Sequence, residues 1–130
     1  MKRILLLLLL GVGCSEEDPA APESVPSFAA GYVKYDDGAN TPVSDAEVFL
    51  VEYRTSDDPP GLPEATGWSK SICTPASGYF SFEFDARMDA CYMAEVYTTS
   101  LTHESVDVPH GNTKYLTLSL PSNLNAVPCN

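Results

Sequence analysis

The chain has 130 residues, and its 18 acidic and 7 basic side chains give a net charge of −11 at neutral pH. This length has room for one domain. A surface as acidic as this one repels the phosphates of nucleic acids, so we expect no nucleic-acid partner. We interpret the acidity as a source of solubility.

Residues 1–13 have the composition of a secretion signal. Lys2 and Arg3 come before seven apolar residues, Ile4 to Leu10, and small residues follow. The apolar run is too short to cross a bilayer, and this order of charge, apolar run and small residues is typical of a signal peptide. We therefore expect residues 1–13 to be cleaved off. The alternative, a retained N-terminal helix, has no amphipathic continuation in the sequence.

The segment Gly11-Val12-Gly13-Cys14 resembles the lipobox of bacterial lipoproteins, in which the signal is cut before a cysteine that carries lipid on its sulfur. The resemblance implies lipidation of Cys14, with acyl chains such as palmitate, and a membrane partner reached through that lipid. Each buried methylene contributes roughly 0.8 kcal/mol, so several chains on Cys14 would hold the protein on the membrane almost permanently. Ser15 after the cysteine implies the outer membrane of the bacterial cell envelope.

Residues 15–27 contain three prolines and four acidic residues, with almost no large apolar side chain. Such a segment cannot bury enough surface to fold. We therefore expect residues 14–27 to be a lipidated cysteine followed by a flexible, acidic, proline-rich tether. Its reach is roughly 40 Å if the tether is extended.

The remaining chain alternates between apolar and polar residues in short segments that turn residues separate. Strands are predicted at residues 31–35, 46–53, 68–74, 80–85, 92–96, 104–108 and 114–120, and no segment has helical periodicity. We expect a long loop at residues 55–67, which hold several prolines. Seven short alternating strands predict an all-β, seven-stranded antiparallel Greek-key β-sandwich at residues 28–121, followed by a tail at residues 122–130.

The strand at residues 80–85 is predicted to form the centre of the core. Its phenylalanines alternate with polar residues, so one face of the strand is aromatic and needs a facing apolar layer. The strand at residues 46–53 is apolar on both faces, which predicts a central position, whereas the strand at residues 68–74 is predicted at an edge. Gly78 supplies the left-handed backbone of the turn before the phenylalanine strand. The expected core comprises Val48, Leu50, Phe80, Phe82, Phe84, Tyr92, Val96, Leu116 and Leu118.

Six short motifs, in this order along the chain, resemble the carboxypeptidase regulatory-like domain. They are Gly31-x-Val33, Asp37-Gly38, Pro42-Val43-x-x-Ala46-x-Val48-x-Leu50, Gly78-Tyr79-Phe80-x-Phe82, Tyr92-x-Ala94-x-Val96 and Leu116-x-Leu118-x-Leu120. The resemblance covers nearly all of residues 30–120. It implies a prealbumin-like sandwich that acts as an accessory to a peptidase or as a part of surface and transport proteins.

Lipid on Cys14 leaves three cysteines in an oxidising compartment, where we expect one disulfide and one leftover thiol. The phenylalanine strand separates Cys73 from Cys91 by roughly 20 Å, which is beyond the reach of a disulfide. We therefore expect Cys129 to pair with one of these two cysteines, and the choice between Cys91 and Cys73 stays open. The cysteine spacings match no zinc pattern, so we expect no metal and no cofactor.

The two histidines, His103 and His110, flank the sixth predicted strand. A serine-histidine-aspartate site would need a nucleophile motif such as G-x-S-x-G, which the sequence lacks. We therefore expect exposed histidines at strand ends and no enzymatic activity. The pairs Asp36-Asp37 and Asp57-Asp58 lack the alternating oxygen ligands of a calcium loop, and we interpret them as turns.

Five aromatic residues are candidate contacts for a carbohydrate or an envelope protein, and the alternative is that they form cross-strand pairs. They are Tyr32, Tyr53, Tyr79, Tyr97 and Trp68. We expect a lipid-anchored cell-envelope lipoprotein with a non-catalytic binding or structural module. The alternatives are a transthyretin-like carrier or assembly unit, in which edge strands pair between chains, and a small envelope hydrolase that uses the histidines.

Overall fold

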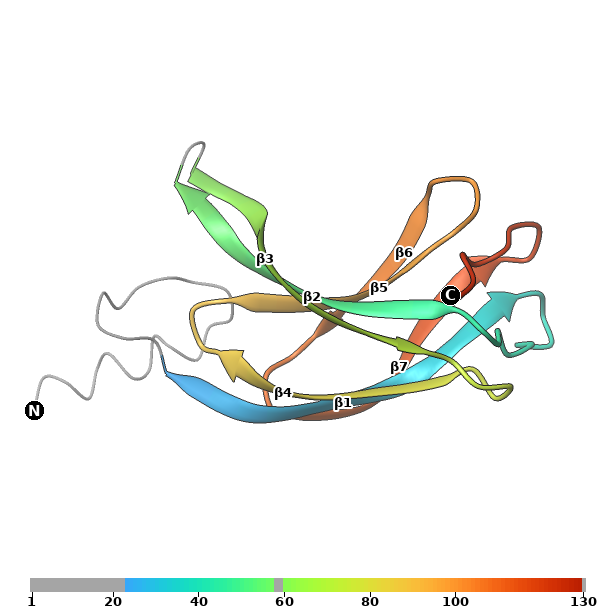
Figure 1. The fold of residues 1–130 in the computed structure, drawn as a ribbon, viewed down its shortest axis with the longest axis horizontal. Coiled ribbons are helices and arrows are strands. Elements are labelled where there is room, and N and C mark those ends of the chain that lie inside the picture. The colour runs from blue at the N-terminus through green and yellow to red at the C-terminus, as the bar shows by residue number, and fades with distance from the viewer. Residues whose placement is uncertain (1–22, 58–59, 130) are drawn as a thin grey trace, which may run out of the picture.

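The computed structural model describes residues 23–57 and 60–129, and within these ranges the chain forms seven strands. They are β1 (Ser24–Asp36), β2 (Glu47–Asp57), β3 (Pro60–Cys73), β4 (Tyr79–Arg87), β5 (Cys91–Tyr97), β6 (His103–Val108) and β7 (Asn112–Pro121). A three-stranded sheet has the order β4-β1-β7, and a four-stranded sheet has the order β3-β2-β5-β6. The two sheets form a sandwich (Figure 1), which confirms the all-β class and the seven strands. The predicted signal peptide, Cys14 and most of the tether lie outside the described ranges.

The three-stranded sheet is mixed, so the prediction of a wholly antiparallel sandwich is wrong. β1 is antiparallel to β4 but parallel to β7. A parallel pair needs a crossover connection, and the whole chain from β2 to β6 provides it here. The alternating pattern could not reveal this pairing, because a strand with one buried face shows the same alternation in a parallel and in an antiparallel pair.

The core lies between the sheets, and the phenylalanines of β4 face the four-stranded sheet across it. All but one of the predicted core residues are buried, while Leu116 is half-buried and packs against the others. Burial of each phenylalanine contributes roughly 1.5–3 kcal/mol to stability. The buried members of the prediction are Val48, Leu50, Phe80, Phe82, Phe84, Tyr92, Val96 and Leu118.

β2 and β3 form a long hairpin, so the loop expected at residues 55–67 is wrong. The pairing runs from Glu47 and Cys73 to Asp57 and Pro60, with two register shifts on the way. The hairpin projects beyond the rest of the sandwich (Figure 1). Its prolines are tolerated because β3 is an edge strand, where one side of the backbone needs no hydrogen-bonding partner. The predicted edge position of β3 and central position of β2 are confirmed.

β1 begins earlier than predicted, so the end of the expected tether belongs to the domain. Residues 24–27 pair with residues 84–87 of β4. Ser27 is buried, and its hydroxyl donates to the carbonyl of Val25 and accepts from the amide of Gly111, each at 2.9 Å. No sequence pattern predicts this part of β1, because the strand there has no continuous apolar face.

The C-terminal tail lies along the domain, and a disulfide joins it to β3. Cys129 pairs with Cys73, with 6.1 Å between the two Cα atoms, which confirms that Cys129 forms a disulfide and decides between its two possible partners in favour of Cys73 over Cys91. The tail's backbone bridges Ala46 at the start of β2, beside the end of β3. Cys91 lies at the opposite end of β2. No cysteine in residues 23–57 and 60–129 has a free thiol, which contradicts the expected leftover thiol.

The turn before β4 approaches β1 closely at Gly78. This glycine has a φ of 77°, and its carbonyl accepts a hydrogen bond of 2.8 Å from the amide of Val33. A Cβ atom at residue 78 would lie 2.5 Å from the Val33 carbonyl oxygen. Glycine is therefore required here both by the backbone conformation and by the lack of space.

We predict that Gly78→Ala destabilises the domain more than Gly38→Ala does. Gly38 has a nearly equal φ of 79° but open space around its Cα atom. Left-handed backbone alone costs a non-glycine residue about 1–2 kcal/mol. The close contact with β1 should raise the loss in free energy of unfolding for Gly78→Ala to roughly 3 kcal/mol or more. Urea unfolding of both variants measures the difference. Equal losses of free energy of unfolding in the two variants would show that the close contact between residue 78 and β1 does not matter.

Candidate functional site

The two predicted histidines have different surroundings. His103 is exposed at the start of β6, and its ring lies 5.3 Å from the ring of Tyr97. His110 is half-buried, and its Nε2 lies 3.0 Å from the carbonyl of Arg87 and 2.9 Å from that of Ala90. That nitrogen carries a proton and donates, because both neighbours are acceptors. His110 therefore fastens the β4–β5 turn, and the expectation of an exposed side chain is wrong for it.

The acidic turn after β1 holds its own backbone. Asp37 accepts hydrogen bonds from the amides of Ala39 and Thr41 and from the Thr41 hydroxyl. These bonds, chiefly the one from the Thr41 hydroxyl, lower the pKa of the Asp37 carboxyl. The predicted turn at this position is confirmed.

In the described ranges no three His, Cys, Asp or Glu side chains come together as a metal site would require. None of the described residues forms a helix with the length and hydropathy needed to cross a membrane.

The five candidate aromatic residues do not gather on one surface. Tyr32 and Tyr79 are cross-strand partners on the outer face of the three-stranded sheet, with ring centroids 5.5 Å apart. Their pairing confirms the alternative interpretation for these two residues. Tyr53 and Tyr97 lie on the outer face of the four-stranded sheet, and Trp68 lies on the edge strand β3.

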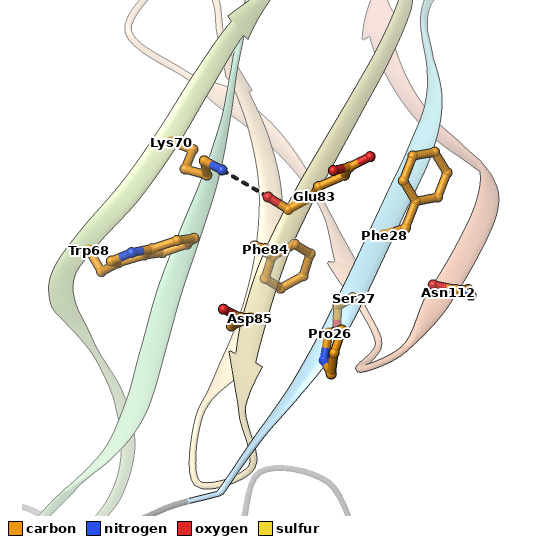
Figure 2. A pocket seen from close by; sticks show the side chains of 9 residues that line it. All are labelled: Pro26, Ser27, Phe28, Trp68, Lys70, Glu83, Phe84, Asp85 and Asn112. Atoms are coloured by element: carbon orange, nitrogen blue, oxygen red, sulfur yellow. Dashed lines mark hydrogen bonds between the residues drawn. The ribbon is translucent and has the colours of Figure 1, made fainter.

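Trp68 lies at one wall of a groove of about 730 Å³ that extends from β3 across β4 to β1 (Figure 2). The indole is 37 % exposed, and its ring centroid lies 6.3 Å from that of Phe84 and 5.8 Å from that of Tyr92. These contacts hold the ring in a fixed orientation while part of it stays open to a ligand. The groove is lined by Pro26, Ser27, Phe28, Trp68, Lys70, Glu83, Phe84, Asp85 and Asn112.

The polar groups of this groove come from four strands, β1, β3, β4 and β7. The Lys70 ammonium donates a hydrogen bond of 2.8 Å to the carbonyl of Glu83, which ties the edge strand β3 to β4 (Figure 2). Asp85 of β4 adds a carboxylate, and Asn112 of β7, the strand partner of Phe28, adds an amide. The sequence identifies Trp68 as a candidate but misses Phe28 and Asn112, because only the pairing of β1 with β4 and β7 brings these residues to the groove.

Two glutamates are buried in the four-stranded sheet, on opposite faces of it. Glu52 faces the core, where it accepts hydrogen bonds from the hydroxyls of Tyr92 and Thr66. Burial and the bond to Glu52 raise the pKa of Tyr92. Because both carboxylate oxygens have a donor, this charge is tolerated at the end of the core.

Glu95 faces outward, yet it is only 3 % exposed. One carboxylate oxygen accepts from the Tyr53 hydroxyl at 2.6 Å, and the other accepts from the Tyr97 hydroxyl at 3.1 Å. The bond to Glu95, together with burial, raises the pKa of Tyr53 to about 12. Burial, and next the bond to Glu95, also raises the pKa of Tyr97.

No protein-family model matches the chain, and no curated protein and no solved structure matches it either. The groove and the buried polar groups are therefore the features of this chain that bear on its function.

We predict that the free energy of unfolding falls as the pH rises from about 10 to about 12. Unfolded tyrosines lose their protons near pH 10, whereas Tyr53 keeps its proton to about 12 in the folded chain. The unfolded state therefore binds fewer protons in this window, which lowers stability with rising pH. Urea unfolding at several pH values should give a shallower alkaline slope for Tyr53→Phe. The matched change Tyr115→Phe, at a side chain that is 83 % exposed, should keep the original slope. If Tyr53→Phe keeps the same slope of unfolding free energy against pH, the raised pKa of Tyr53 does not cause the alkaline loss of stability.

Proposed function

We propose that the protein is a lipid-anchored lipoprotein of the bacterial cell envelope, and that its sandwich binds a ligand without catalysing a reaction. The anchor is supported by the order of a basic start, an apolar run and small residues before Cys14. Ser15 after this cysteine supports the outer membrane as the location. The binding role is supported by the groove at Trp68.

The proposed fold family is the carboxypeptidase regulatory-like domain, with a prealbumin-like Greek-key sandwich. The order of six motifs along residues 30–120 supports it. The seven strands in two sheets also support it, together with four passages of the chain between the sheets, before β2, β4, β5 and β7. In such a module the outer faces and edges of the sheets are free to bind, because the inner faces form the core.

The proposed ligand is a carbohydrate of the envelope, and the partly exposed Trp68 is the observation on which this rests. A sugar ring has an apolar face that stacks on an aromatic ring, and hydroxyls that hydrogen-bond to carboxylates and amides. The groove offers both, since Trp68 of β3 and Phe28 of β1 line it with aromatic rings, and Asp85 of β4 and Asn112 of β7 line it with a carboxylate and an amide. The volume of the groove lies in the range of small-ligand sites, and its lining combines three aromatic rings with five polar side chains.

The anchor is tested by the mass of the full chain after expression in bacteria with its own signal. We predict that residues 1–13 are removed and that the new N-terminal cysteine carries acyl chains, so the protein stays with the membrane fraction. Cys14→Ser should abolish the added mass, while Ser15→Ala should leave it unchanged. A mature chain that keeps residues 1–13, or one in which Cys14 forms a disulfide, would contradict lipidation.

Carbohydrate binding is tested by fluorescence, since Trp68 is the single tryptophan of the chain and reports on this groove alone. Soluble glycan fragments of the bacterial envelope should change its emission in a saturable way. Loss of one neutral hydrogen bond costs about 0.5–1.5 kcal/mol, so Asn112→Ala should weaken binding about two- to tenfold. Asp107→Asn, on the outer face of the other sheet, should not change the affinity. Saturation that is identical in both variants would place the ligand elsewhere.

A further inference from the structure

A second pocket, of about 570 Å³, lies on the outer face of the four-stranded sheet. Its floor consists of facing pairs from β5 and β6, in which Glu95 is opposite Ser105 and Met93 is opposite Asp107. Tyr53 of β2 lies along one side. The pocket shares no lining residue with the Trp68 groove, so it is a separate site.

The carboxylate of Glu95 is the central group of this pocket. It lines the pocket while being almost completely buried, and each of its oxygens accepts one tyrosine hydroxyl. A carboxylate can accept about four hydrogen bonds, so both oxygens have capacity for a further donor. The tyrosines hold the carboxylate in a fixed position, which favours binding because little side-chain freedom is lost when a ligand arrives.

The charge of Glu95 has no counterion among residues 23–57 and 60–129. The two ion pairs in those ranges join Arg54 and Arg87 to Asp89. Arg54 also lines the pocket, but its guanidinium is held by Asp89 at 3.0 Å. Asp107 on the same floor adds a second acidic side chain. A buried charge is normally paired, so a carboxylate without a cation at the floor of an acidic pocket indicates a site for one.

We propose that this pocket binds a primary ammonium or a guanidinium group. Its N–H groups donate to Glu95 and Asp107 in charge-assisted hydrogen bonds, and the Tyr53 ring lies beside the cation. Met93 contacts the alkyl chain that carries the charged group. The net charge of −11 attracts such ligands to the surface. This site is independent of the carbohydrate groove, so either proposal can fail alone.

The test is an NMR titration of the purified full chain with Nα-acetyl-arginine amide, Nα-acetyl-lysine amide and butane-1,4-diamine. We expect saturable shifts of backbone amides in β5 and β6. Nα-acetyl-citrulline amide, which has nearly the shape of the arginine probe without its charge, should cause no saturable shift. Tighter binding of the capped amino acids points to a side chain of a partner protein, and tighter binding of the diamine points to a free amine. Either order supports a cation site.

Three variants distinguish binding in this pocket from a general attraction of cations to the negative charge of the protein. Glu95→Gln should weaken binding of the cations by about tenfold or more, because it removes the charge that assists the hydrogen bonds. Asp107→Asn, an exposed change that leaves the core intact, should weaken binding about two- to threefold. Glu104→Gln removes the same charge from β6 on its opposite face and should leave the affinity unchanged.

Four results would overturn the proposal. They are the absence of saturable shifts with the cations, equal shifts with the citrulline probe, an equal loss in Glu104→Gln, and full affinity in a folded Glu95→Gln. Thermal unfolding of each variant establishes that it is folded. If Glu95→Gln does not fold, Asp107→Asn decides: a loss relative to Glu104→Gln supports the site, and an unchanged affinity contradicts it.

Discussion

The packing of the β4 phenylalanines against the four-stranded sheet is the contact on which the other features depend. Phe80 and Phe82 lie with their ring centroids 6.1 Å apart, and Phe84 lies 5.0 Å from the ring of Tyr92 on β5. This row of rings fixes how closely the two sheets approach each other. It also positions the Trp68 groove, because Phe84 reaches the indole at the edge of the sandwich.

At one end of the core, the buried polar groups of Tyr92 and Glu52 form hydrogen bonds with other residues of the domain. The Tyr92 hydroxyl donates to Glu52 and accepts from the amide of Arg87, and Glu52 also receives the Thr66 hydroxyl. The same Tyr92 ring contacts His110, which holds the β4–β5 turn. A buried polar network of this kind is tolerated only when its members are satisfied, and it then restricts the core to one arrangement. Stability at this end therefore depends on hydrogen bonds as much as on apolar contact.

Local patterns predicted what lies within a strand, and they missed what depends on neighbours far along the chain. Alternation identified all seven strands and the phenylalanine face, and Gly78 stands where its turn requires it. The parallel pairing of β1 with β7, and the choice of Cys73 over Cys91 as the partner of Cys129, depend on where distant segments meet, which composition does not encode. The same limit applies to the Trp68 groove, of which the sequence predicts only one part. Trp68 was visible as an aromatic residue on a polar edge strand, whereas the polar groups opposite it come from other strands.

Alternation along a strand also separates stability from binding, because inward residues build the core and outward residues can change freely. Glu95 is the exception that carries the argument for the second pocket. It faces outward, where a carboxylate would normally be hydrated, yet Tyr53 and Tyr97 reach over and bury it. Burying a charge without a counterion costs free energy and adds nothing to the apolar core. The burial of Glu95 places a fixed anionic hydrogen-bond acceptor at the floor of a pocket. A ligand that brings a positive charge would pair with this carboxylate and offset the free energy that its burial costs.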